Sequence, residues 1–177
     1  MKSKYDIIWI DNVDSTNDEA RRRIDSLDNL SVISTYEQTA GRGQRTRSWC
    51  SEAGKNLLFS IVLKNPAILP SQQVRISDIA AESVKELLAN HDIEAWIKPP
   101  NDIWVKEKKI CGILIEHSLI GNRISWSIIG IGLNVNQSSF PDDLPNPTSM
   151  ILENKGFDIE DLLSEFMDIF INRASAL

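Results

Sequence analysis

Alternating and continuous runs of hydrophobic residues along this chain predict a series of β-strands. Residues 5–10 and 30–37 are rich in β-branched and aromatic side chains, a composition typical of strands. Residues 57–63 read LLFSIVL, an almost unbroken apolar run that predicts a strand buried on both faces. Further strands are predicted over residues 93–97, 102–105, 110–117 and 124–136, the second and third of these forming a hairpin around a charged turn.

The first of four predicted helices follows the first strand. It is expected to begin at Asp14 or Ser15, with Asp18 completing a capping box. Its apolar face is expected to consist of Ala20, Ile24 and Leu27.

The other three helices are predicted from capping residues and helical spacing. One is expected from Ser71 to about residue 90, with an inner face of Val74, Ser77, Ala81, Val84 and Leu88. A short helix is expected to start at Thr148 or Ser149 and to end at Gly156. The last is capped by Asp158, and its apolar positions are Ile159, Leu162, Leu163, Phe166, Ile169 and Phe170.

The order of these elements, with runs of strands separated by few helices, predicts an α+β fold. We expect a mixed, mostly antiparallel sheet with the helices largely on one face. The chain has 177 residues and no internal repeat, low-complexity tract or linker. Residues 1–177 are therefore expected to form a single domain with a sizeable core.

Composition narrows the functional class. The net charge of −6 argues against bulk affinity for nucleic acid or anionic membranes, and no apolar stretch is long enough to span a bilayer. The N-terminus lacks the pattern of a signal peptide, and Cys50 and Cys111 lack paired spacing, so a cytoplasmic protein with reduced thiols is expected. With His91 and His117 as the two histidines, a zinc site made by protein side chains is not expected.

Residues 38–49, QTAGRGQRTRSW, locally reverse the sign of this charge. The segment carries three arginines and no acid, and its Gly41 and Gly43 allow positive φ and close approach of the backbone to a ligand. Guanidinium groups offer forked donors suited to phosphate and carboxylate. From this segment alone, an anion-binding loop and a solvated basic loop or nucleic-acid patch are equally good interpretations.

Four stretches taken together resemble the biotin protein ligase (biotin–carboxylase ligase) family. They are DSTN at 14–17, QTAGRG at 38–43 running on to RSW at 47–49, KPPND at 98–102 with Lys109 and GIL at 112–114, and GIGLNVN at 130–136. Each stretch alone is a weak signal, whereas their order and spacing are specific. The resemblance implies a catalytic domain with a fold like that of class II aminoacyl-tRNA synthetases.

The resemblance also implies a two-step reaction. Biotin and MgATP would give biotinyl-5′-AMP and pyrophosphate, and the biotinyl group would then pass to a lysine of the biotin-carrier domain of a carboxylase. The expected ligands and partners are therefore biotin, ATP with Mg²⁺, and that carrier domain. A homodimer formed by pairing of sheet edges, as among relatives, is left open.

The resemblance assigns roles to individual residues. Biotin is expected to be bound by Ser15, Thr16, Asn17, Gln38, Gly41, Arg42, Trp49, Lys109 and Gly112. ATP and the adenylate are expected to be bound by Arg42, Arg45, Arg47, Trp49, Lys98, Asn101, Gly130, Ile131, Leu133 and Asn134. Arg42 and Lys109 are expected to offset the charge of the reacting anions, and Asp102 to orient the incoming lysine amine. No protein side chain is assigned to a metal.

Ordinary structural roles stay open for several of these residues. Ser15 and Thr16 can cap a helix, Trp49 can be a core residue and Lys109 can be a surface lysine in a turn. Lys98 can belong to a structural ion pair.

The sequence also departs from the family pattern. Gln44 stands where arginine is common, Thr46 where glycine is usual, and Pro99 where the family has tryptophan. The chain is further expected to lack the N-terminal helix-turn-helix segment and the C-terminal SH3-like domain of many relatives. These departures leave two alternatives open: a degenerate biotin-binding module without turnover, and a lipoate or octanoyl ligase or transferase of the same fold.

Overall fold

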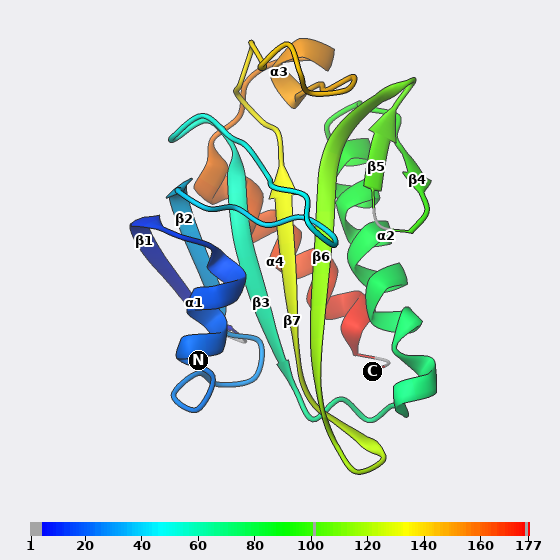
Figure 1. Ribbon diagram of the computed structural model, residues 1–177. Coiled ribbons are helices and arrows are strands. Elements are labelled where there is room, and N and C mark those ends of the chain that lie inside the picture. Colours follow the sequence, from blue (N-terminus) through cyan, green and yellow to red (C-terminus); the bar gives the residue numbers. More distant parts are fainter. Residues whose placement is uncertain (1–4, 101, 176) are drawn as a thin grey trace.

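A single mixed β-sheet organises the computed structural model, which describes residues 5–100, 102–175 and 177 (Figure 1). Its strands lie in the order β1-β2-β3-β7-β6-β5-β4. β1 pairs with β2 in parallel and every other described pair is antiparallel, which confirms the predicted mixed, mostly antiparallel sheet. The strands are β1 (Ile7–Val13), β2 (Val32–Gln38), β3 (Leu57–Lys64), β4 (Trp96–Lys98), β5 (Asp102–Val105), β6 (Lys108–Ile120) and β7 (Arg123–Leu133).

The helices cover the two faces of the sheet unequally. α2 (Val74–Asn90) and α4 (Ile159–Ala174) pack against each other on one face, as predicted, whereas α1 (Thr16–Arg22) lies on the other against β2, β3 and β7 (Figure 1). The short elements η1 (Pro70–Gln72) and α3 (Met150–Glu153) lie in the connections. None of the described helices is long and apolar enough to cross a membrane.

β3 and β7 separate two hydrophobic cores, because successive side chains of a strand point to opposite faces. Ile61 of β3 and Ile129 of β7 belong to the larger core, which is closed by α2 and α4. Their neighbours Val62 and Ile128 belong to a smaller core with Ala20 of α1. The apolar run of β3 is thus explained, since a strand with helices on both sides needs no polar face.

The inner face of α2 agrees with the prediction at Ala81, Val84 and Leu88, which are buried in the larger core, and differs at the start of the helix. The helix begins at Val74 after the 3₁₀ turn η1, so Ser71 does not cap it. Val74 is 59% exposed and Ser77 is not among the buried residues. Ile76, Ala80 and Leu87 complete the buried face beside these residues, at helical spacing.

The other helix ends agree with the prediction in part, since α2 ends at Asn90 and Ser149 is the N-cap residue of α3, both as predicted. α1 ends at Arg22, although Leu27 in the turns that follow still reaches the smaller core. α3 ends at Glu153 and not at Gly156. The predicted cap of α4 is confirmed, because the Asp158 carboxylate accepts hydrogen bonds from the second and third backbone N–H groups of that helix.

Candidate active site

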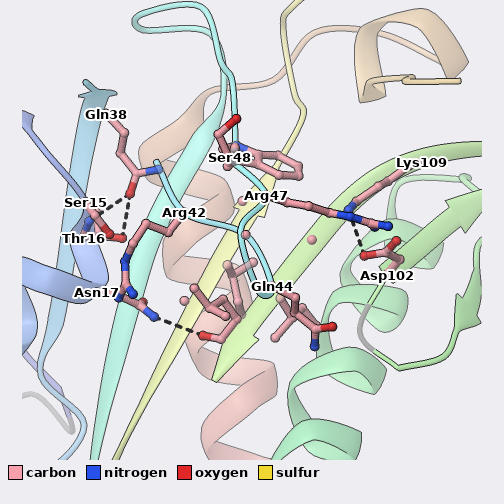
Figure 2. Close-up of a pocket in the computed structure, with 18 residues that line it drawn as sticks. Ser15, Thr16, Asn17, Gln38, Arg42, Gln44, Arg47, Ser48, Asp102 and Lys109 are labelled. Carbon is pink, nitrogen blue, oxygen red and sulfur yellow. Dashed lines mark hydrogen bonds and ion pairs between the residues drawn. The ribbon is translucent and has the colours of Figure 1, made fainter. Parts of the chain in front are cut away.

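A pocket lies on the face of the sheet that carries α1, above β3, β7 and β6 (Figure 2). It brings together twelve of the predicted site residues: Ser15, Thr16, Asn17, Gln38, Arg42, Arg47, Trp49, Asp102, Lys109, Gly112, Gly130 and Ile131. Its remaining lining residues are Gly43, Gln44, Ser48, Ile113, Leu114 and Gly132. Segments far apart in sequence therefore converge on one site.

Glycines make the floor of the pocket. Gly112 of β6 and Gly132 of β7 are cross-strand partners. A Cβ atom at Gly112 or Gly132 would lie 2.9 or 2.6 Å from the Trp49 ring, and one at Gly130 would clash even more severely with Asn17 Oδ1. These glycines therefore leave the space that side chains from α1 and from the loop at 39–56 occupy.

A buried polar network forms the end of the pocket beside α1. The Thr16 backbone N–H donates to Gln38 Oε1 at 2.9 Å, and the Thr16 hydroxyl lies 3.2 Å from the same oxygen. Ser60 Oγ of β3 lies 2.7 Å from Thr16 Oγ1 and 2.6 Å from Asn17 Oδ1. This end therefore offers neutral hydroxyl and amide groups, the partners that a neutral hydrogen-bonding ring requires.

α1 does not begin with the predicted capping box. Ser15 occupies the N-cap position, yet its side chain makes no capping hydrogen bond. The Thr16 N–H is taken by Gln38, and Asp14 Oδ1 accepts from the Ser15 N–H at 2.7 Å. Ser15, only 2% exposed, therefore has a hydroxyl that is not used for capping and borders the pocket.

Asn17 connects α1 to β3 and β6 through side-chain hydrogen bonds. Its Oδ1 accepts from Ser60, while its Nδ2 donates to the Leu114 carbonyl at 3.2 Å and to Glu116 Oε2 at 2.9 Å. Since a side-chain amide has two N–H donors, both are used within the protein. Asn17 thus positions the pocket wall and keeps no free donor for biotin in this arrangement.

Lys109 and Asp102 lie at the other end of the pocket (Figure 2). Lys109 Nζ is 2.8 Å from Asp102 Oδ1 and 5.5 Å from the centroid of the Trp49 ring. The backbone of Lys109 is held by hydrogen bonds with Asn146 and Thr148. The Lys109 ammonium group at this end, which we call the cationic end, is therefore paired with one carboxylate.

The loop at 39–56 crosses β3 and β7 and reaches β6 (Figure 1). It forms a small hairpin, because Gly43 N–H donates to the Arg47 carbonyl and Trp49 N–H donates to the Gly41 carbonyl, each at 2.8 Å. The loop thereby carries Arg42, Arg47 and the Trp49 ring over the pocket.

The expected role of the loop glycines is corrected in one respect. Neither Gly41 nor Gly43 has a positive φ; the left-handed residue of this hairpin is Arg45, with φ of 60°. A Cβ atom at Gly41 would lie 2.5 Å from the Trp49 carbonyl oxygen. Gly41 is thus needed for close packing within the loop itself.

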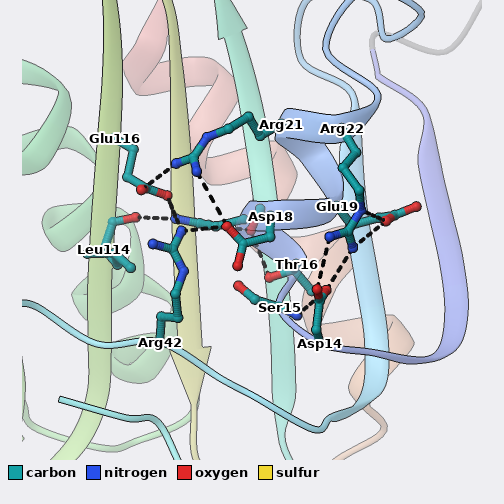
Figure 3. A network of polar contacts seen from close by, with 12 residues as sticks. Asp14, Ser15, Thr16, Asp18, Glu19, Arg21, Arg22, Arg42, Leu114 and Glu116 are labelled. Carbon is teal, nitrogen blue, oxygen red and sulfur yellow. Dashed lines mark hydrogen bonds and ion pairs between the residues drawn. The ribbon is translucent and has the colours of Figure 1, made fainter. Parts of the chain in front are cut away.

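Arg42 enters the pocket between two carboxylates (Figure 3). Its Nη2 lies 2.6 Å from Glu116 Oε2 and 3.0 Å from Asp18 Oδ1. Burial alone would raise the pKa of Glu116, but hydrogen bonds from Arg42, Asn17 and Arg21 outweigh this effect and hold that pKa below its ordinary value. Glu116 is therefore an ionised partner of Arg42 at neutral pH.

Several predicted nucleotide-binding residues lie outside the pocket lining. Lys98 is exposed, and its ammonium group lies 3.6 Å from the centroid of the Trp104 ring. Arg45 is exposed in the turn of the loop hairpin. Leu133 faces the larger core, and Asn134 is buried and donates to the Thr148 carbonyl at 2.9 Å.

Asn101 lies outside the described residues. Ser60 and Glu116, by contrast, belong to the site although the sequence analysis did not select them. Ser60 is the one polar residue within the run LLFSIVL, and Glu116 follows the apolar run ICGILI. A polar residue in a buried strand is a sequence signal for a functional site, because such positions are normally apolar.

Comparison with known proteins shows which curated proteins and solved structures this chain is similar to. The chain is 36% identical to the bifunctional ligase/repressor BirA of Bacillus spizizenii over 132 residues, which cover 73% of this chain and 40% of that protein. It is 33% identical to the biotin–[acetyl-CoA-carboxylase] ligase of Paracoccus denitrificans over 124 residues, covering 69% of this chain and 51% of that protein. The chain therefore spans about half or less of the length of these curated relatives.

The structure is similar to that of the biotin protein ligase from Aquifex aeolicus solved in complex with biotin and ATP. The TM-score is 0.81 at 27% sequence identity, and the match covers 96% of this chain and 70% of that chain. The fold expected from the sequence resemblance is thus confirmed. The model of the biotin/lipoate A/B protein ligase family matches residues 9–134, a range that contains the whole pocket lining. The chain therefore belongs to the biotin/lipoate A/B protein ligase family.

Proposed function

We propose that this chain is an ATP-dependent biotin ligase that forms biotinyl-5′-AMP and transfers the biotinyl group to a lysine of a biotin-carrier domain. The observation that carries the proposal is the distance between two kinds of group in one pocket, neutral hydrogen-bonding groups beside Gln38 and the ammonium group of Lys109. Gln38 ends β2 and Lys109 lies in β6, three strands further along the sheet. At ~4.8 Å per strand they are roughly 14 Å apart. An elongated ligand with a polar ring at one end and a carboxylate at the other matches this separation.

The first step brings a carboxylate against a triphosphate. A biotin carboxylate oxygen bonds to the α-phosphorus of ATP, the bond from that phosphorus to the β-phosphate bridging oxygen breaks, and pyrophosphate leaves. Lys109, Arg42 and Arg47 supply positive charge where the two anions meet. The Trp49 Nε1–H is buried without a hydrogen-bond partner and offers one more donor.

The second step needs an uncharged amine. The acceptor lysine nitrogen attacks the carbonyl carbon of the mixed anhydride, AMP leaves with the bonding electrons, and the nitrogen loses a proton. Because a lysine has an ordinary pKa of about 10.4, a carboxylate beside it assists this loss. Asp102 lines the pocket at the cationic end, where the anhydride carbonyl would lie.

Mg²⁺ would arrive with ATP. Within residues 5–100, 102–175 and 177 no group of three or more His, Cys, Asp or Glu side chains is placed to hold a metal ion. Mg²⁺ commonly takes its ligands from substrate phosphates, water and one or two carboxylates, so this set of residues fits an ion carried by the nucleotide. Its contribution would be to neutralise phosphate charge.

The test is exchange of labelled pyrophosphate into ATP with biotin, lipoate or octanoate as the acid. We expect exchange with biotin alone, because the buried polar end of the pocket would leave hydroxyl and amide groups unpaired against an apolar acyl chain. Exchange with lipoate or octanoate but not biotin would assign the chain to the other branch of the family. Tight biotin binding with no exchange would identify a binding module.

Retention of the adenylate gives a further prediction at Gln44, which lines the pocket. Gln44→Arg should slow release of preformed biotinyl-AMP by about tenfold, since a hydrogen bond to a charged group contributes about 1.5 kcal/mol. Release is measured by displacement with excess unlabelled ligand. Thr46→Gly is the matched control and should change nothing, because the positive φ of this turn belongs to Arg45. Equal release from the parent and Gln44→Arg would show that this position does not control retention.

A further inference from the structure

A cluster of four charged residues joins the loop at 39–56 to the rest of the protein (Figure 3). Arg42 of the loop contacts Glu116 of β6 and Asp18 of α1, at 2.6 and 3.0 Å. Arg21 of α1 pairs with the second oxygen of Glu116. Two carboxylates and two guanidinium groups balance within this cluster, so its formation buries no net charge.

Glu116 is the best-fixed member of this cluster. Its side chain is 22% exposed, and it accepts from Asn17 Nδ2 at 2.9 Å as well as from both arginines. A carboxylate held by three donors, two from α1 and one from the loop, has little freedom to rotate. The Arg42 guanidinium bound to it is therefore held in one orientation.

Arg42 keeps an unused donor in this orientation. Its Nε is buried and has no hydrogen-bond partner, although the residue lines the pocket. A buried, unpaired donor on a charged group is costly unless a ligand supplies an acceptor. The contacts of Nη2 with the two carboxylates thus fix the group, while Nε stays available for an oxygen of a bound anion.

We propose that Glu116 is a positioning residue for Arg42. It fixes the guanidinium on the pocket wall where the adenylate binds, and it anchors the loop to β6. The identity of the ligand rests on the proposed function, whereas the fastening of the loop does not. In a competing arrangement, Glu116 would hold Arg42 away from the ligand. Removing the carboxylate would then raise the exchange rate or the affinity for the adenylate, whereas our proposal expects a loss.

The test compares Glu116→Gln with Glu19→Gln. Glu19 is a close match, because it is 13% exposed on α1 and also binds two arginines, Arg22 and Arg23, but it does not line the pocket. We expect Glu116→Gln to lower kcat/KM for biotin-dependent pyrophosphate exchange by about 10- to 100-fold, the effect of a misplaced reacting group. Glu19→Gln should stay within about twofold of the parent, since it leaves Arg42 in place. Faster exchange or tighter adenylate binding in Glu116→Gln would overturn the proposal in favour of competition.

Coupling to Arg42 separates positioning from a general structural role. In an Arg42→Gln background, Glu116→Gln should cause little further loss of exchange, because its effect passes through the guanidinium. Fully additive losses would refute the proposal, since they would show that Glu116 acts independently of Arg42.

A second readout needs neither ligand nor turnover. Trypsin cleavage after Arg45 and Arg47 should be faster in ligand-free Glu116→Gln than in the parent or in Glu19→Gln. Equal cleavage in all three would show that Glu116 does not anchor the loop.

If Glu116→Gln does not fold, Arg42→Lys takes its place, because it keeps the charge but loses the forked guanidinium that bridges Glu116 and Asp18. Absence of exchange in the parent would reject the proposed function, and the trypsin comparison would still decide the role of Glu116.

Discussion

Replacing Lys109 with alanine should slow formation of biotinyl-AMP by about 10²-fold or more, while biotin affinity changes much less. The reason is that the ammonium group acts mainly on charge that develops when the carboxylate attacks the phosphate. Its position supports this role, since Nζ lines the cationic end of the pocket and lies 2.8 Å from Asp102. The measurement is the single-turnover rate of adenylate formation, with biotin affinity determined separately by calorimetry.

The control for this variant is Lys98→Ala. Lys98 is a lysine of the same motif, but its ammonium group stacks on Trp104 outside the pocket lining. Its removal should leave the single-turnover rate within about twofold, because its ammonium group lies outside the pocket lining and only its backbone pairs with Asp102. An unchanged rate in Lys109→Ala would assign Lys109 to an ordinary surface role.

A second substitution, at Asp102, separates two causes of the expected loss in Lys109→Ala. Lys109→Ala leaves the Asp102 carboxylate without its cation, facing two incoming anions. Part of the loss should therefore come from repulsion, and Asp102→Asn in the Lys109→Ala background should recover part of the adenylation rate. No recovery would indicate that the whole loss comes from the missing ammonium group.

The strands and the motif residues of this protein were largely predictable from its sequence. The apolar runs define β3 and β7 because their side chains fill cores on both faces, and the spacing of the four motifs reflects one pocket. The inner face of α2 was predicted correctly at Ala81, Val84 and Leu88 and wrongly at Val74 and Ser77. The helix begins at Val74 and not at Ser71, so the first predicted turn does not face the core, and helix boundaries are the least certain part of a pattern.

The contacts that position the site were beyond sequence reasoning. Asn17 meets Glu116 across 99 positions and Thr16 meets Ser60 across 44, and strand register decides which side chains share a face. Ser60 and Glu116 lie on the pocket side because they alternate with the core residues Ile61 and Ile115. Such pairs follow from the sheet order, which no local pattern encodes.

Gly130→Ala should both destabilise the protein and weaken biotin binding. The new Cβ atom would lie well inside the 3.0 Å that real Cβ atoms keep from other atoms, against Asn17 Oδ1. Asn17 has little room to move, because Ser60, Glu116 and the Leu114 carbonyl hold its amide. Overpacking of this kind costs about 1–3 kcal/mol in the free energy of unfolding.

The effect of Gly130→Ala on binding follows from the position of Asn17 at the start of α1. Displacing Asn17 moves Ser15 and Thr16, so biotin affinity should fall by about tenfold or more, as for other misplaced recognition groups. Gly156→Ala is the matched control, because its Cβ would meet Asn136 Oδ1 at 2.9 Å, away from the pocket lining. That variant should lose stability, measured by denaturant unfolding, and keep biotin affinity, measured by calorimetry. If Gly130→Ala binds biotin as tightly as the parent, the contact between Asn17 and the floor of the pocket does not set the geometry of its polar end.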